Sequence, residues 1–253
     1  MTTNVICRPK KLLTSDSRWS APIIGHPDLF VFADDTGFDK LAVSSAHALV
    51  FAGDSELISY WKTWFTAPAL DFSKLPPFQR QDVRSGTVES IVASLVKKPS
   101  CEVMFTSGRF EAHGEIARFS GSGALYAKDC YARNGCGRTA IKTASQSDLA
   151  TGGETKFVEL ASGSSNLTVM QASHSEMITA LHHRGLVMDT KTKNVTPISE
   201  WMANNGHAQA NVASAIGSVS APTGLPTREW SNQEQIEFIK ALQEVAREEN
   251  RMM

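Results

Sequence analysis

The chain has 253 residues, 42% of them hydrophobic, which is enough for one sizeable α/β domain or one domain with an appendage. Its 25 basic and 26 acidic residues give a formal net charge of −1, without a long block of like charge. This balance gives no reason to expect a nucleic-acid partner.

The N-terminal segment MTTNVICRPKK lacks the apolar core of a signal peptide, and no run approaches the roughly 18 apolar residues of a membrane span. We therefore expect a cytoplasmic protein with no membrane partner. The cysteines are scattered, and the closest pair, Cys130 and Cys136, has five residues between its members. That spacing fits neither a disulfide framework nor a standard zinc knuckle, so we expect reduced, mostly structural thiols.

Short apolar or alternating runs predict strands in the first fifth of the chain, over residues 4–7, 11–15, 29–33, 41–43 and 48–52. After Gly53, apolar residues recur at three- and four-residue spacing up to Phe65 and predict a helix. The prolines from Pro68 onward end it. A second helix is predicted over 88–96, ending before Pro99.

The middle of the chain predicts two strands, 102–107 and 111–119, joined as a hairpin around Gly108. Helices are expected over 124–131 and 139–150, the second ended by Gly152 and Gly153 as a left-handed cap. A strand over 155–160 follows. Groups of strands alternating with groups of helices favour an α+β fold over a regular parallel sheet.

The C-terminal part divides by composition. Residues 203–227 are rich in Ala, Ser, Gly, Asn and Pro and are interpreted as a loop or linker after a domain over 1–202. Residues 228–253 are expected to carry an amphipathic helix, since Ser231 and Glu234 form a capping box. Its apolar stripe is predicted to consist of Ile236, Ile239, Leu242 and Val245.

A hydroxyl at a chain terminus can be activated by the α-amine of its own residue, whose ordinary pKa of about 8 suits a general base near neutrality. The sequence opens Met1-Thr2-Thr3, and the small residue after methionine permits removal of Met1. Thr2 is therefore a candidate nucleophile. Many cytosolic proteins begin in this way, so this feature alone has little weight.

Further motifs follow in a fixed order over residues 2–160. They are Thr2-Thr3-x-Val5 with Thr14-Ser15-Asp16-Ser17-Arg18, then Phe38-Asp39-Lys40-Leu41, Ala48 to Asp54 (ALVFAGD), Gly121-Ser122-Gly123, and Ala140-Ile141 with Asp148 and Thr151-Gly152-Gly153. In this order the motifs resemble those of proteasome β subunits and their bacterial relative HslV, which are N-terminal-nucleophile (Ntn) hydrolases. The resemblance implies a four-layer αββα sandwich, here with a C-terminal helical extension.

The resemblance also implies a role for each matching residue. Thr2 Oγ1 would attack the scissile carbonyl, Lys40 would lower the pKa of the hydroxyl and the terminal amine, and Asp16 would hold Lys40 by a charge-assisted bond. The backbone N–H of Gly53 would be the oxyanion donor.

Ser122, Asp148 and Thr151 would bracket the terminal amine by hydrogen bonds. Thr151 stands where the family usually has serine, and it keeps the hydroxyl. Candidates for the substrate pocket are Ser20, Val31, Phe51 and Ser55.

Two regions depart from the family pattern. The helix expected after Gly53 is short and is followed by a proline-rich stretch over 68–77, so the outer helical layer must differ. The roughly 90 residues after Leu160 exceed what the family fold needs. Adjacent His182 and His183 have no ligand partner at metal-binding spacing and are interpreted as residues without a functional role.

The activity implied is that of a threonine endopeptidase, which hydrolyses peptide bonds through an acyl-enzyme on Thr2 and needs no cofactor. The implied partners are further copies of the chain in stacked homo-oligomeric rings and a peptide or unfolded protein as substrate. An ATP-dependent unfoldase is a further candidate partner, which no residue here specifies. Two alternatives stay open: a non-proteolytic Ntn amidase, and a catalytically silent ring subunit that serves as a scaffold.

Overall fold

The computed structural model describes residues 2–82, 86–108, 110–224 and 228–250. In this part of the chain, seven α-helices accompany two antiparallel sheets, so the fold mixes α and β structure as expected. None of the helices described there combines the length and the apolar character needed to cross a bilayer.

The smaller sheet has five strands in the order β10-β11-β1-β2-β12. Their bounds are Asn4–Cys7 for β1, Leu12–Ser15 for β2, Glu111–His113 for β10, Ala117–Ser120 for β11 and Lys156–Glu159 for β12. Strands β1 and β2 form a hairpin in which Asn4 lies opposite Ser15. Thr2 and Thr3 therefore enter the middle of this sheet, beside the end of β2.

The larger sheet follows the order β14-β13-β4-β3-β15-β6-β8-β7, with β5 paired to β6 and β9 paired to β8. The bounds are Trp19–Ile23 (β3), His26–Ala33 (β4), Leu41–Val43 (β5), His47–Asp54 (β6), Gln79–Gln81 (β7), Val88–Lys97 (β8), Glu102–Thr106 (β9), Leu186–Asp189 (β13), Val195–Pro197 (β14) and Ser220–Ala221 (β15). The two-residue strand β15 separates β3 from β6.

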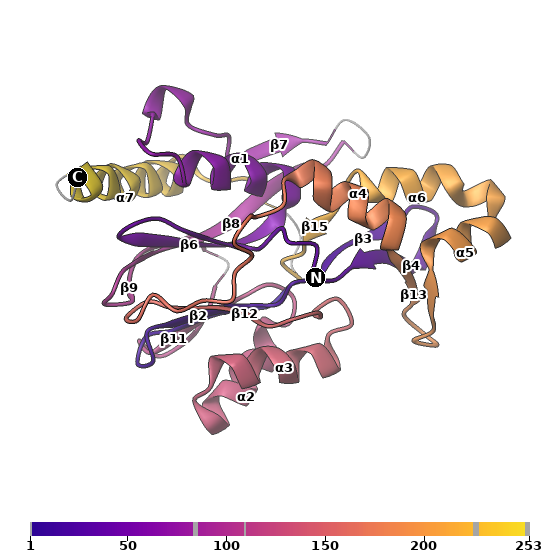
Figure 1. Cartoon of the computed structure of the whole chain (residues 1–253), viewed down its shortest axis with the longest axis horizontal. Helices are drawn as coiled ribbons and strands as arrows, with labels where there is room; N and C mark the ends of the chain where they lie inside the picture. Colours follow the sequence, from indigo (N-terminus) through magenta and orange to yellow (C-terminus); the bar gives the residue numbers. More distant parts are fainter. Residues whose placement is uncertain (1, 83–85, 109, 225–227, 251–253) are drawn as a thin grey trace.

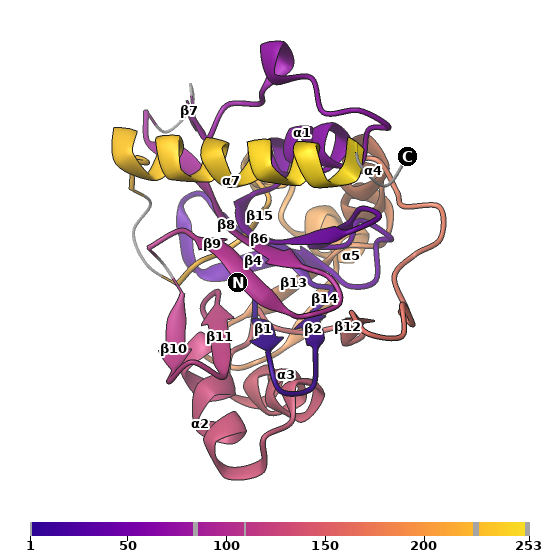
Figure 2. The same cartoon turned by 90° about the vertical axis from the view of Figure 1, so that its left-hand side faces the viewer.

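Helices cover the outer face of each sheet (Figures 1 and 2). Helices α2 (Ala124–Asn134) and α3 (Gly137–Ser147) lie against the smaller sheet. The helices on the side of the larger sheet are α1 (Ser55–Phe65), α4 (His174–Arg184), α5 (Ile198–Asn204), α6 (Gln209–Ile216) and α7 (Asn232–Asn250).

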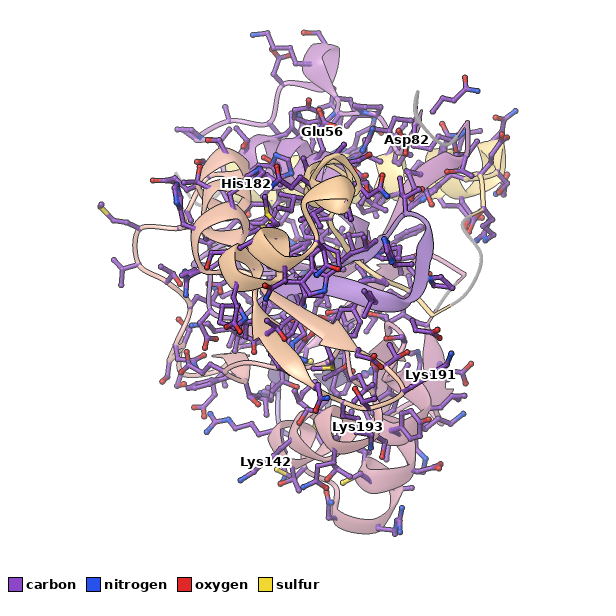
Figure 3. The ribbon with its side chains drawn as sticks, turned by 90° about the vertical axis from the view of Figure 1, so that its right-hand side faces the viewer. Glu56, Asp82, Lys142, His182, Lys191 and Lys193 are labelled. Atoms are coloured by element: carbon purple, nitrogen blue, oxygen red, sulfur yellow. The ribbon has the colours of Figure 1, made fainter. Side chains whose placement is uncertain are left out.

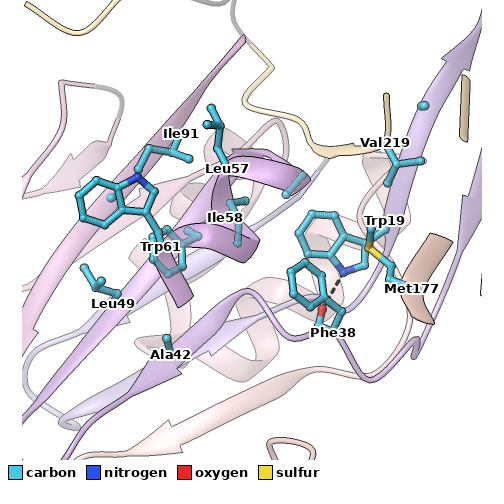
Figure 4. Close-up of a cluster of buried hydrophobic side chains, with 14 of the residues drawn as sticks. Trp19, Phe38, Ala42, Leu49, Leu57, Ile58, Trp61, Ile91, Met177 and Val219 are labelled. Atoms are coloured by element: carbon cyan, nitrogen blue, oxygen red, sulfur yellow. Dashed lines mark hydrogen bonds between the residues drawn. The ribbon is translucent and has the colours of Figure 1, made fainter. Parts of the chain in front are cut away.

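Hydrophobic clusters hold these elements together, because burying apolar surface is the main favourable term in folding. Ile6, Leu13, Val50 and Val96 belong to the cluster between the sheets. Val5 and Phe119 pack with Ile141 and other residues of α2 and α3. The largest cluster joins the larger sheet to its helices, and in it Trp19 Nε1 donates to the Phe38 carbonyl at 2.7 Å (Figure 4).

The expected helix over 88–96 is wrong, because these residues form strand β8. Strand β8 pairs with β6 and β9 and is buried on both faces over most of its length. Residues 91–96 are therefore apolar except for Ser94 and show no regular alternation. The hairpin expected around Gly108 is also wrong. Strand β9 pairs with β8 in the larger sheet, whereas β10 pairs with β11 in the smaller one.

Residues 203–227 were expected to be a loop or linker, but the described part of this segment contains α6 and β15. Val212 and Ala221 from these elements are buried in the largest cluster. Residues 225–227 lie outside the described residues, as do Met1 and residues 251–253 of the expected C-terminal helix.

Helix α7 begins with the predicted capping box. Glu234 N donates to Ser231 Oγ at 3.2 Å, and Ser231 N donates to Glu234 Oε2 at 3.1 Å. The predicted stripe is partly wrong, because Ile236 is 47% exposed and Phe238 is fully buried in its place. Helix α3 ends with Asp148 as its cap rather than with a left-handed glycine.

Candidate active site

Three buried side chains meet at one carboxylate oxygen. Thr2 Oγ1 donates to Asp16 Oδ1 at 2.5 Å, and Lys40 Nζ donates to the same oxygen at 2.8 Å. The side chains of all three residues are buried. Thr2 precedes β1 and Asp16 follows β2, so the β1-β2 hairpin brings these two together, while Lys40 comes from the segment before β5.

The Asp16 carboxylate is surrounded by donors. Besides Thr2 and Lys40, the Thr3 N–H reaches Oδ1 at 2.9 Å. The backbone N–H groups of Arg18 and Gly152 reach Oδ2, each at 3.2 Å. These bonds fix the orientation of the Asp16 carboxylate, and the carboxylate in turn orients both the threonine and the lysine.

The pKa of Lys40 is lowered from its ordinary value, chiefly because the ammonium is buried, and the charge of Asp16 opposes this shift. Lys40 Nζ also donates to the Arg18 carbonyl at 2.6 Å and lies 5.3 Å from the centre of the Trp19 ring. A desolvated lysine of this kind gives up its proton more readily than a surface lysine. Lys40 can therefore act on a neighbouring hydroxyl as a cation or as a base.

The second predicted group also comes together. Ser122 Oγ and Thr151 Oγ1 each donate to Asp148 Oδ2 at 2.7 Å. The Thr151 hydroxyl lies 2.6 Å from Thr3 Oγ1, so this group is connected to Thr3. Thr3 had been given no role from the sequence. Its position directly after the candidate nucleophile is the signal that could have identified it.

The loop Gly121-Ser122-Gly123 makes a close approach to both threonines. A Cβ on Gly121, whose φ is +92°, would lie 2.0 Å from the Thr2 carbonyl oxygen, and a Cβ on Gly123 would lie 2.0 Å from Thr3 Oγ1. The Gly123 N–H donates to the Thr2 carbonyl at 3.2 Å. Only glycine fits at these two places, which explains the motif physically.

Gly53 lies near the end of β6 with φ at +104°, where a Cβ would stand 2.2 Å from the Ser90 carbonyl oxygen. Backbone conformation and lack of space both require glycine here. Gly53 pairs with Ile91 of β8 on one side and with Ala221 of β15 on the other. Its role as oxyanion donor stays a prediction.

The four substrate-pocket candidates lie in different surroundings. Ser20 is in β3 opposite Ser220, and Ser55 begins α1 with its Oγ 2.9 Å from His174 Nε2. Val31 and Phe51 are fully buried in the cluster between the larger sheet and its helices. Both are core residues in this structure, and a pocket role for them stays a prediction.

Arg18 is a further residue that the sequence left without a role. Its guanidinium binds Asp34 through two bonds of 2.7 and 2.8 Å and donates to the Leu149 carbonyl at 2.5 Å. A Cβ on Gly152 would lie 2.4 Å from Arg18 Cζ. Arg18 therefore fixes the 149–152 segment, including the Gly152 N–H that contacts Asp16.

The described cysteines and the adjacent histidines lie elsewhere in the fold. The cysteines are free, with Cys7, Cys101 and Cys130 buried and Cys136 half-buried. His182 and His183 are exposed on α4, and Figure 3 shows His182 at the surface. Over residues 2–82, 86–108, 110–224 and 228–250, no three or more His, Cys, Asp or Glu side chains are placed to hold a metal ion.

The arrangement has a nucleophilic hydroxyl, a buried cation and an orienting carboxylate, which are the components of a nucleophile activated by its neighbours. The interpretation of this group of residues as an active site depends on their geometry and on the ordered sequence motifs over residues 2–160. No protein-family model matches the chain, and neither does any curated protein or solved structure at a significant level.

Proposed function

We propose that this chain is an N-terminal-threonine hydrolase of the proteasome β-subunit type, which cleaves peptide bonds with Thr2 as nucleophile once the bond before Thr2 has been cut. The observation that carries this proposal is the meeting of Thr2 Oγ1 and Lys40 Nζ on one oxygen of buried Asp16. A scaffold protein has no need to bury a charged lysine and a carboxylate beside a threonine hydroxyl, since burying charges costs free energy.

The chemistry follows from the positions of these groups. The freed α-amine of Thr2 accepts the hydroxyl proton, and Oγ1 attacks the scissile carbonyl to give a tetrahedral intermediate. The Lys40 ammonium stabilises the negative charge that develops on Oγ1, and Asp16 keeps Lys40 in place. The α-ammonium then gives its proton to the departing nitrogen, so that collapse of the intermediate releases the amine product and leaves an ester on Thr2. Water attacks that ester while the neutral α-amine accepts its proton, and the proton returns to Oγ1 as the carboxylic acid product leaves.

The group around Asp148 supports the same proposal. Ser122 and Thr151 share one Asp148 oxygen and connect to Thr3, and the Gly123 N–H binds the Thr2 carbonyl. We infer that these groups set the position and the pKa of the freed α-amine. Thr151, which replaces the family's serine, supplies the hydroxyl for this network.

The fold is compatible with the four-layer αββα sandwich of Ntn hydrolases, because two antiparallel sheets lie between helices (Figure 1). Assembly into stacked rings, an unfoldase partner and a cytoplasmic location belong to the proposal as well. The short helix α1 and the additional helices α4 to α7 alter the layer that would carry ring contacts.

The test is intact-mass measurement with and without a threonine-directed epoxyketone, on wild type, Thr2→Ala and Thr3→Ser. We expect a mature chain that begins at Thr2, one adduct in wild type and in Thr3→Ser, and none in Thr2→Ala. An adduct that persists in Thr2→Ala, or no adduct under conditions that label a control proteasome, would overturn the assignment of Thr2. For the amidase alternative, rates on peptides and on small amides of the same acyl group are compared.

A further inference from the structure

Strand β15 bridges the larger sheet beside the candidate site. Ser220 pairs with Ser20 of β3, while Ser220 and Ala221 pair with Asp54 and Gly53 of β6, all antiparallel (Figure 1). Two residues that arrive from far along the sequence therefore complete the sheet between β3 and β6. Without them, both strands would present unpaired backbone groups at this place.

The segment around β15 bonds to residues of the candidate site through its backbone. The Val219 carbonyl accepts from the Ser55 N–H at 3.4 Å, and the Pro222 carbonyl accepts from the Ser122 N–H at 3.2 Å. In an antiparallel pair of strands, every second pair of opposite residues is joined by backbone hydrogen bonds. Ser55 and Val219 are bonded in this way, so Gly53 and Ala221, two residues further along each strand, form the next hydrogen-bonded pair.

An extended peptide presents the same alternating N–H and C=O groups and binds a sheet by adding a strand to it. We propose that residues 219–224, here called the strap, occupy the groove between β3 and β6 that an extended peptide substrate needs. The strap must therefore be displaced before a peptide can reach Thr2. This inference rests on the proposed function, because it takes Thr2 as the nucleophile and a peptide as the substrate.

The strap is buried at its start and exposed at its end. Val219 and Ala221 are buried in the cluster of the larger sheet, and Figure 4 shows Val219 in the same cluster as Trp19. Gly224 is exposed. The chain is anchored again at Trp230, whose Nε1 donates to the Ile91 carbonyl at 2.8 Å. Opening therefore begins at exposed Gly224, and full displacement also moves Ala221 out of the cluster.

Gly224 is the place to test the strap. Its φ is +73°, and an added Cβ would lie 2.6 Å from Ser122 Cα, so Gly224→Ala forces the strap away from Ser122. Gly163 offers a matched control, with φ at +74° and no atom within 4 Å of an added Cβ. Gly163→Ala carries the same backbone strain without the collision.

Two measurements on the full chain distinguish displacement of the strap from the reactivity of Thr2. One is hydrogen exchange at the Ser122 amide, and the other is the rate of epoxyketone labelling. We expect Gly224→Ala to raise both rates at least about tenfold, because the open population sets each of them. Gly163→Ala should stay at the wild-type values.

If Gly224→Ala speeds exchange at the Ser122 amide but no variant is labelled by the epoxyketone, the result supports the strap and counts against the proposed function. If wild type and Gly224→Ala are labelled equally fast, the strap does not block access to Thr2, while the assignment of Thr2 as nucleophile is unaffected. Unchanged exchange at Ser122 in Gly224→Ala would also overturn the strap. If Gly224→Ala loses its thermal unfolding transition, Ala221→Gly takes its place, with an expected gain of about two- to fivefold.

Discussion

Thr2 Oγ1 and Lys40 Nζ are neighbours across a single oxygen of Asp16, at 2.5 and 2.8 Å from it. Two different parts of the fold create this relationship. The β1-β2 hairpin sets Thr2 against Asp16, and Lys40 is fixed to β6 because its carbonyl accepts from the Phe51 N–H at 2.9 Å. The positions of the Thr2 hydroxyl and of the Lys40 side chain thus both depend on this carboxylate.

Replacing Asp16 by Asn should damage both activity and stability. The amide removes the negative charge and leaves the Lys40 ammonium buried without its counter-ion, a change that costs about 3–5 kcal/mol. Labelling of Thr2 by an epoxyketone should slow at least about 100-fold. Urea unfolding and labelling rates measure the two effects.

A suitable control is Asp35→Asn. Asp35 accepts bonds from Ser17 Oγ at 2.5 Å and from Glu154 N at 2.8 Å, and its φ of +52° is one that Asn tolerates well. This change removes a nearby carboxylate that does not contact Lys40, so labelling should stay within about twofold of wild type. Equal labelling in Asp16→Asn and Asp35→Asn would refute the role of Asp16.

Thr151→Val should be more harmful than Thr151→Ser. Valine keeps the shape but removes the hydroxyl between Thr3 Oγ1 and Asp148 Oδ2, which costs about 1–3 kcal/mol because buried polar partners lose their bond. Serine keeps that hydroxyl and should cost less than about 1.5 kcal/mol. Urea midpoints of the two variants provide the measurement. Similar losses in both would show that the methyl group matters and the hydroxyl does not.

The sequence predicted which residues belong to the candidate site better than it predicted the hydrogen bonds between them. Thr2 and Asp16 flank one hairpin, so local pattern brings them together, whereas Lys40 and the group around Asp148 came from the ordered motifs. Arg18 was missed because its role depends on Asp34 and Leu149, distant partners that no local signal marks. Thr3 was missed although it directly follows the candidate nucleophile, because its role depends on the distant Thr151.

The errors in the fold have similar causes. Residues 88–96 were expected to be a helix because a strand buried on both faces lacks alternation. In α7, Ile236 and Phe238 point to different sides of the helix, and both sides carry apolar residues at helical spacing. The aromatic neighbours of Phe238 decide between them, since the Phe105 and Trp61 rings lie 4.7 and 5.3 Å from its ring.

Lys62 should make stability rise with pH above neutrality. Burial lowers its pKa from 10.5 to about 7, an effect that Asp39 opposes. Between these values the unfolded chain binds more protons than the folded one, so the free energy of unfolding increases with pH in that window. The penalty for burying the ammonium is full below about pH 7. Urea midpoints from pH 6.5 to 9.5, compared with those of Lys62→Met, measure the effect.

In Lys62→Met this rise should be smaller, because Lys40, whose pKa is also lowered, still contributes to it. The stability gained by the variant over wild type should be largest at pH 7 and smallest near pH 10. Lys74→Met is the matched control, because Lys74 is exposed and pairs with Asp71 at 3.2 Å. An identical pH dependence in wild type and Lys62→Met would mean that Lys62 is not the group responsible.

Glu234 should make the fold sensitive to acid. Its bond from Arg228, and further bonds from Ser231 and Gly108, lower the pKa of its carboxyl from 4.5 to about 2. Below pH 4.5 the unfolded chain takes up the proton first, so stability falls progressively as the pH drops toward 2. In Glu234→Gln this loss should disappear. The capping box survives, because glutamine also serves at that position.

The measurement is the difference in urea midpoint between wild type and Glu234→Gln at steps from pH 6 to 2. The difference should be largest near neutrality, at about 1 kcal/mol for a partly exposed pair, and should vanish near pH 2. Glu237→Gln removes an exposed carboxylate that bonds to Gln233 Nε2 at 2.6 Å on the same helix, and it controls for loss of charge. If Glu237→Gln removes the acid sensitivity as fully as Glu234→Gln does, the cause is the charge of the whole helix. If only Glu234→Gln removes it, the pair with Arg228 and the bond from Gly108 hold the start of α7 in place.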